Sequence, residues 1–191
     1  MYGSRIPQDR CGPALNGTGN ERRDLTPAPG PGDDSGGREL AQALARGVAR
    51  HLSDRGFDCL SEFSLGNGRR ADLIGLGRGG DVVIVEIKSS VADFRSDGKW
   101  PEYLDWCDRF YFAVAAGFPA DILPGAPGLI VADAFGGETL RETEPSPLHA
   151  SRRKALTVRF ARTAARRLQS ERDAAESAGP AGRTIPTLGA D

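Results

Sequence analysis

The stretch VVIVEIKSS, residues 82–90, has the composition of a core strand of a sheet but carries two charged side chains, Glu86 and Lys88. Five of its nine residues are β-branched and apolar, a composition typical of a buried strand. Since side chains alternate along a strand, Glu86 and Lys88 share one face with Ile84. Burying an unpaired carboxylate is costly, so Glu86 is expected to have a cation or a proton beside it.

Two further strands are predicted immediately before this one, at residues 57–65 (FDCLSEFSL) and 69–77 (RRADLIGLG). The turn signals Gly-Asn-Gly and Arg-Gly-Gly-Asp separate the three strands. Strands joined by tight turns pair antiparallel, so the three form a meander. A symmetric hairpin through the second turn pairs Asp72 with Glu86 and brings two carboxylates to one point of the sheet.

Helices are predicted on either side of the meander. Residues 38–55 carry leucine or valine at every fourth position, the spacing of an apolar stripe on a helix. Pro101 suits the first turn of a shorter helix over 101–107, where its missing N–H is not needed. A long helix is predicted over 148–174, with one apolar side formed by Val158, Ala161, Ala165 and Leu168.

The remaining strands are predicted at 109–114 (RFYFAV) and 128–134 (GLIVADA), with a loop containing a helical turn between them. Because a helix precedes residues 109–114, this strand can join the sheet parallel to one of the first three. The expected fold class is α/β, with a mixed sheet flanked by helices. Three aromatic side chains spaced three residues apart are assigned to its core, namely Trp100, Tyr103 and Trp106.

The folded domain is predicted to span residues 38–174, including the basic C-terminal helix. Residues 1–37 are rich in Gly, Pro, Asn and Asp and show no periodic apolar pattern, so they are predicted to be a disordered arm. Residues 175–191 have a similar composition and are predicted to be a disordered tail.

Composition and cysteine usage exclude several classes of protein. The 191 residues are 39% hydrophobic and 27% charged, as expected for one soluble domain. Without an apolar run of the ~20 residues that span a bilayer, or the apolar segment of a signal peptide, a cytoplasmic location without membrane contact is expected. Three widely spaced cysteines and two isolated histidines suggest neither a zinc site nor a histidine-based catalytic site. Cys59 and Cys107 are expected to be packing residues.

Asp72, Glu86 and Lys88 form the strongest candidate site. Two carboxylates held close together repel unless a cation lies between them, and Mg²⁺ (or Mn²⁺) is suited to carboxylate and phosphate oxygens. A lysine beside them can orient water or meet the charge of a phosphate. Only three of the 25 basic residues are lysines, which favours a specific role for the one at position 88. The alternative is a surface ion pair between Glu86 and Lys88, with Asp72 capping a turn.

Further polar residues are candidates for contact with an anionic partner such as DNA. Residues 150–169 hold seven basic residues and no acidic residue, a composition that can neutralise phosphates. The candidates in the loop after position 88 are Ser89, Arg95 and Lys99. Those in the long helix are Arg152, Arg153 and Lys154. The alternatives are an ordinary surface loop and a solvated helix face.

The order of Asp72, a turn, an apolar run and Glu86-Ile87-Lys88 resembles the D…(D/E)xK signature of the PD-(D/E)xK nuclease superfamily. Residues 38–167, and above all the segments ADLIGL, VVIVEIKSSVADFRSDGKWPEYLDWCDRFYFAV and SRRKALTVRFAR, resemble the MmcB family of bacterial DNA-repair proteins. This resemblance implies a restriction-endonuclease-like αβββαβ core. It also implies that Asp72, Glu86 and the backbone carbonyl of Ile87 are metal ligands, with Lys88 as the catalytic lysine.

Two positions depart from the superfamily pattern. Ala71 precedes Asp72 where proline is common, and the metal-binding glutamate that many members carry on the first helix has no clear equivalent. Glu39 on the first helix and Glu62 on the first strand are the candidates for this ligand, and exposed surface positions are the alternative for both.

The expected function is a Mg²⁺-dependent DNA endonuclease acting in repair, on damaged or branched DNA and together with other repair proteins. One alternative is a catalytically inactive member that binds DNA or a repair partner through the same fold. Another is a regulatory protein-interaction module without DNA contact.

Overall fold

The computed structural model describes residues 34–177; most of the predicted arm 1–37 and tail 175–191 lies outside the described residues. The helices are α1 (Asp34–Asp54), α2 (Val91–Ser96), α3 (Pro101–Leu104), the short 3₁₀ helix η1 (Ala120–Ile122) and α4 (Ala150–Ser177). The strands are β1 (Phe57–Ser64), β2 (Arg70–Gly77), β3 (Val82–Lys88), β4 (Arg109–Ala115), β5 (Gly128–Ala132) and β6 (Gly137–Arg141). The predicted αβββαβ order and the α/β class are confirmed.

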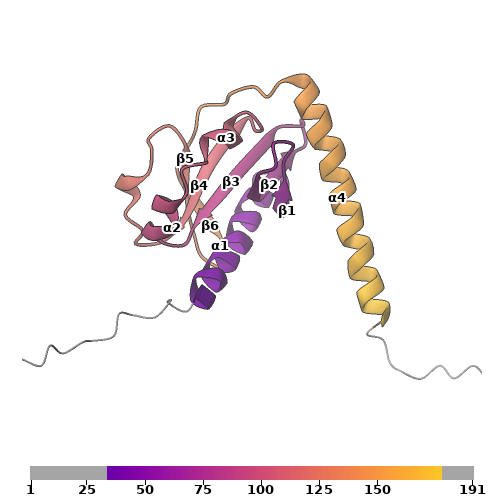
Figure 1. Ribbon diagram of the computed structural model, residues 1–191, viewed down its shortest axis with the longest axis horizontal. Coiled ribbons are helices and arrows are strands. Elements are labelled where there is room, and N and C mark those ends of the chain that lie inside the picture. The colour runs from indigo at the N-terminus through magenta and orange to yellow at the C-terminus, as the bar shows by residue number, and fades with distance from the viewer. Residues whose placement is uncertain (1–33, 178–191) are drawn as a thin grey trace, which may run out of the picture. The chain divides into compact units, whose positions relative to one another are not determined.

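The strands form one six-stranded sheet in the order β1-β2-β3-β4-β5-β6 (Figure 1). The first three pair antiparallel, as the tight turns predict. Strand β4 pairs parallel to β3, and β5 pairs parallel to β4, before β6 returns antiparallel. The predicted mixed sheet is therefore confirmed. Because β3, β4 and β5 run parallel, their carboxyl ends lie at the same end of the sheet.

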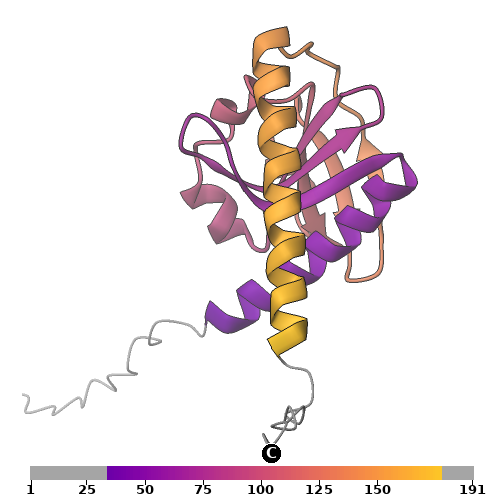
Figure 2. The same cartoon turned by 90° about the vertical axis from the view of Figure 1, so that its right-hand side faces the viewer.

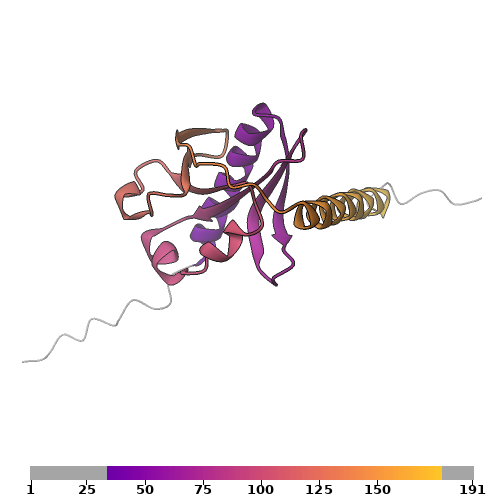
Figure 3. The same cartoon turned by 90° about the horizontal axis from the view of Figure 1, so that it is seen from above.

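Helices cover both faces of the sheet (Figure 3). Leu44, Val48 and Leu52 of α1 pack on the face that carries Val83 and Val85 of β3. On the opposite face, α3 and the start of α4 pack against a cluster rich in aromatic rings. Tyr103 is buried in that cluster, with Trp100 and Trp106 packed against it, so their predicted core role is confirmed. Cys107 is buried and Cys59 is partly buried and packed on the α1 side, also as predicted.

The sequence patterns miss two elements and shift the start of a third. Helix α1 begins at Asp34, four residues before the predicted start. Helix α2 lies in the segment predicted as a polar loop; it has no buried residue and therefore no apolar stripe to reveal it. Strand β6 lies at the sheet edge, where alternation between half-buried and exposed residues in a five-residue segment is a weak signal.

The apolar side predicted for α4 is wrong. Val158 and Leu168 are 51% and 49% exposed, whereas Leu156 and Phe160 supply the buried contacts. Helix α4 runs beside the edge strand β1 (Figure 2). Two arginines hold it there: Arg159 donates to the Ser64 carbonyl at 3.0 Å and Arg167 to the Glu62 carbonyl at 3.2 Å. Contacts with the core and with the edge strand β1 thus determine which side of α4 is packed.

None of the helices within residues 34–177 has the length and apolar character needed to cross a membrane.

Candidate active site

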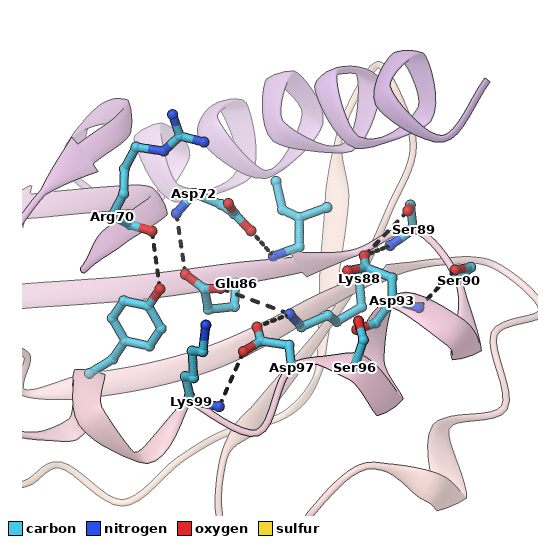
Figure 4. A network of polar contacts seen from close by, with 12 residues as sticks. Arg70, Asp72, Glu86, Lys88, Ser89, Ser90, Asp93, Ser96, Asp97 and Lys99 are labelled. Carbon is cyan, nitrogen blue, oxygen red and sulfur yellow. Dashed lines mark hydrogen bonds and ion pairs between the residues drawn. The ribbon is translucent and has the colours of Figure 1, made fainter. Parts of the chain in front are cut away.

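The candidate site lies where β2 and β3 separate (Figure 4). The last pair of their ladder is Leu73 with Val85, and the same register continued by one step sets Asp72 opposite Glu86, as predicted. Beyond that pair, hydrogen bonds from main-chain N–H groups to the Asp72 and Glu86 carboxylates replace the main-chain hydrogen bonds between the strands. The Asp72 N–H donates to Glu86 Oε1 at 3.3 Å, and the Ile87 N–H donates to Asp72 Oδ2 at 2.8 Å. Two carboxylates and the Ile87 backbone are therefore gathered at one place.

A break in strand alternation positions Asp72. The register of β1 and β2 skips the pair of Glu62 and Asp72, and Glu62 has a left-handed φ of 50°, an uncommon conformation for a residue with a side chain. Ala71 packs in the aromatic-rich core, although Leu73, two residues later, packs on the α1 side. Regular alternation would place these two residues on the same face of the sheet; they lie on opposite faces because the alternation is interrupted at Asp72. Asp72 consequently lies in a cleft that α1 borders.

Burial and nearby negative charges make both carboxylates hard to ionise. Glu86 is 3% exposed. Burial, followed by the negative charge of Asp72, raises its pKa from the ordinary 4.5 to about 8. Burial also raises the pKa of Asp72, although the hydrogen bond from Ile87 and the charge of Lys88 oppose this. A cation bound between the two groups would remove this penalty.

Lys88 has a second acidic partner that sequence reasoning missed. Its side chain is 3% exposed, and its Nζ lies 2.5 Å from Asp97 Oδ2 and 4.0 Å from Glu86 Oε2. Burial opposes ionisation of Asp97, but hydrogen bonds from Lys88 and from the Lys99 N–H hold its pKa below the ordinary value. The alternative of a surface ion pair between Glu86 and Lys88 is thus wrong, since both side chains are buried.

A capping pattern in the sequence could have revealed the segment that carries Asp97. Ser90 and Asp93 are three residues apart, a spacing typical of a helix start. In the structure the Ser90 side chain accepts from the Asp93 N–H at 3.1 Å and caps α2. Helix α2 then delivers Asp97, its C-cap residue, to Lys88.

The site opens into a cleft of about 1050 Å³. One side of the cleft is formed by α1 and the other by β1, β2, β3 and the α2 segment. The residues of α1 that line it include Arg38, Gln42 and Arg46, whereas Glu39 is exposed outside the lining. Glu62 does line the cleft and forms a 2.6 Å ion pair with Arg70. Of the two glutamates predicted as further metal ligands, the structure brings only Glu62 to the cleft.

The loop residues predicted to contact DNA lie near the cleft but have different surroundings. Ser89 donates from both its N–H and its hydroxyl to Asp93 Oδ2, at 3.1 and 3.3 Å. Lys99 and Arg95 are exposed, and neither is among the residues lining the cleft.

The basic residues at the start of α4 lie at the other end of β3. Arg153 binds both carboxylate oxygens of Asp108 at 2.7 Å, and Asp108 also accepts from the Val82 N–H, the first residue of β3. Six residues of strand, about 20 Å, separate Val82 from Lys88. Arg152 lies over the Trp106 ring at 5.2 Å, and Lys154 is exposed. The structure therefore does not bring residues 152–154 together with Asp72 and Glu86.

Among the described residues no group of three or more His, Cys, Asp or Glu side chains is arranged to hold a metal ion. Asp72 and Glu86 are two carboxylates, the number with which proteins commonly hold Mg²⁺ when water and phosphate complete its shell.

Comparison with known proteins identifies the family. A family model described as DNA repair protein MmcB-like matches residues 28–175. A search of curated proteins gives no match. The solved structure of the SPO1766 protein of unknown function from Silicibacter pomeroyi is 49% identical, with a TM-score of 0.69 over 70% of this chain and 92% of that one.

A repair endonuclease from Pyrococcus abyssi is 16% identical over 52% of this chain and 48% of its own, with a TM-score of 0.29, too low to inform fold or function. The family model, in contrast, covers the helices, the sheet and the cleft described above, so the chain belongs to the MmcB-like DNA repair protein family.

Proposed function

We propose that the protein is a Mg²⁺- or Mn²⁺-dependent DNA endonuclease of the PD-(D/E)xK type. The observation that carries the proposal is the meeting of the half-buried Asp72 and the buried Glu86 with the buried ammonium group of Lys88, at the end of a core strand. Membership of a DNA repair family supports DNA as the substrate.

The residues fit a divalent cation. Asp72 and Glu86 each have a raised pKa, and burial is the first cause for both. Their carboxylate oxygens are hard ligands of the kind that Mg²⁺ prefers, and the Ile87 carbonyl is the further ligand that the family resemblance implies. A bound Mg²⁺ ion would supply Lewis-acid stabilisation of charge on a phosphate and lower the pKa of water.

The protein's own groups would orient the reactants. The Asp72 and Glu86 side chains are fixed by the main-chain N–H groups that they accept, so little reorganisation is needed to present their oxygens. Lys88 is fixed by Asp97 and lies on the same side of β3 as Glu86. From there its ammonium group can donate to a water molecule or to a phosphate oxygen.

The test is cleavage of supercoiled, nicked, branched and single-stranded DNA in Mg²⁺ and in Mn²⁺, with purified wild type and three variants. Glu86→Gln and Lys88→Ala are expected to abolish cutting. Glu39→Gln is the matched control, because it removes a carboxylate from α1 outside the cleft, and it should cut like the wild type. Cutting that survives in both Glu86→Gln and Lys88→Ala would refute the active-site assignment.

Calorimetric titration with Mn²⁺ tests the metal site without relying on activity. Wild type and Lys88→Ala are expected to bind the ion, and Glu86→Gln is expected to lose most of the affinity. DNA binding that is independent of metal, with no cleavage of any substrate, would instead favour the alternative of an inactive nuclease fold that binds DNA.

A further inference from the structure

The two sides of the cleft carry different chemistry. Three side chains of α1 that line it can donate hydrogen bonds, and none of them is acidic: Arg38, Gln42 and Arg46. All five carboxylates of the lining come from the opposite side: Glu62, Asp72, Glu86, Asp93 and Asp97. The two basic residues on that side, Arg70 and Lys88, form ion pairs with Glu62 and Asp97. A ligand between these sides would meet donors on one flank and, through a bound cation, carboxylates on the other.

The three donors, called here the α1 donor row, follow one face of the helix. Arg38, Gln42 and Arg46 are each four residues apart, so they lie one above the other. The row extends about 12 Å along the helix axis. A repeating anion of that length, with charges spaced along it, matches the row better than a compact ligand does.

We infer that the cleft receives the sugar–phosphate backbone of double-stranded DNA, with the α1 donor row contacting phosphates next to the one held at Asp72 and Glu86. The inference rests on the proposed function, and names the form of DNA and the side chains that hold it. Arginine suits this role because its guanidinium group binds phosphate oxygens in a bidentate manner.

The absence of aromatic rings in the cleft favours a duplex over a single strand. Proteins that bind single strands commonly stack the unpaired bases on aromatic side chains. Among the described residues that line the cleft, none is aromatic. Trp100 and Tyr103 pack in or against the core. Bases that remain paired within a duplex need no such platform, whereas their phosphates need the donors that α1 provides.

The most exposed phenylalanine ring among the described residues lies outside the cleft. Phe135 is 83% exposed, in the turn between β5 and β6. Gly47 of α1 packs tightly on this turn, with the Gly136 carbonyl 2.6 Å from the position that a Cβ would occupy. Gly47 is adjacent to Arg46 in sequence and points about 100° away around the helix, so the turn lies on a different side of α1 from the donor row.

Binding measurements that do not depend on cleavage test the inference. A fluorescent 30-base-pair duplex and the single strand of the same length are titrated in Ca²⁺ over a range of salt concentrations, with a gel to verify that the DNA stays intact. The duplex is expected to bind on the order of tenfold more tightly than the strand. Arg46→Ala should weaken duplex binding about tenfold and reduce the slope of log K against log salt by about 0.9, the value for one phosphate contact.

Arg50→Ala is the matched control. It removes the same charge from the next turn of α1, but Arg50 donates to the Ala134 carbonyl and does not line the cleft. Its salt slope should equal that of the wild type, and thermal melting should show both variants folded.

Three results would overturn the inference: single-strand binding as tight as duplex binding, an unchanged slope for Arg46→Ala, or an equal loss of slope for Arg50→Ala. None of these outcomes depends on cutting. If the protein binds duplex through Arg46 but never cleaves DNA, the proposed nuclease activity is refuted and the proposed duplex site stands. If it cleaves DNA but Arg46→Ala leaves duplex binding unchanged, the proposed duplex site is refuted and the nuclease activity stands.

Discussion

Replacing Glu86 with glutamine should stabilise the metal-free protein, and increasingly so as the pH rises. The glutamine side chain would keep an acceptor for the Asp72 N–H, which donates to Glu86 Oε1 in the wild type. The replacement would also remove the negative charge that burial and Asp72 disfavour. A residue that is proposed to bind a cation is therefore expected to reduce stability when that cation is absent.

The magnitude follows from the pKa of Glu86, which rises from 4.5 to about 8 on folding. Between these two values the unfolded chain has lost the Glu86 proton and the folded protein still holds it. Stability therefore falls with rising pH, by up to about 1.36 kcal/mol for each pH unit. From pH 5 to pH 8 the wild type should lose about 3 kcal/mol relative to Glu86→Gln.

The assay is urea denaturation of both proteins in EDTA at several pH values from 5 to 8.5. The difference between the two free energies of unfolding largely cancels the titration of distant groups. Addition of Mg²⁺ at about a hundred times its dissociation constant should then return about 2.7 kcal/mol to the wild type at pH 8, and little to the variant. A difference that stays constant over this pH range, or that falls as the pH rises, would refute the reasoning.

Two further predictions concern the framework that positions the site. Asp108→Ala should reduce the free energy of unfolding by about 3 kcal/mol, because it leaves Arg153 and two main-chain N–H groups without their acceptor. As a control, Asp105→Ala, at a side chain that is 79% exposed, should change the free energy of unfolding by less than about 0.5 kcal/mol. Gly47→Ala should cost about 2 kcal/mol by forcing α1 off the β5–β6 turn. Gly36→Ala, with open space around its Cβ position, should be neutral or stabilising; equal melting temperatures for the two glycine variants would contradict this view of the packing.

The meander and its charged strand were predictable because their signals are local. Turn residues set the hairpin between β2 and β3, and the hairpin alone fixes which residue stands opposite Glu86. The parallel addition of β4 followed from the helix that separates it from β3. Asp72, Glu86 and Lys88 could therefore be grouped from their positions in the sequence.

Other members of the site depend on contacts between segments that are distant in the sequence. Asp97 reaches Lys88 only because α2 turns the chain back over β3, and α2 has no apolar stripe. Gln42 and Arg46, rather than Glu39, line the cleft because the apolar side of α1 is fixed by the sheet. The orientation of a helix about its own axis depends on all of its packing contacts. The position of one acidic residue such as Glu39 therefore does not reveal which polar residues of α1 border the cleft.

The β-meander, the mixed sheet and the pairing of Asp72 with Glu86 could all be predicted, since periodicity and turn chemistry act over a few residues. The way in which these groups are held depends on contacts in the folded protein. The left-handed Glu62 breaks the alternation of β1 and β2 and turns Asp72 into the cleft. The packing of α4 places Arg153 against Asp108, where it donates to both carboxylate oxygens. Arg153, which was predicted from the sequence to contact DNA, therefore stabilises the framework instead. Burial of Glu86 and Lys88 follows from helices packing on both faces of the sheet, and this burial converts an ordinary pair of charges into a site suited to a cation.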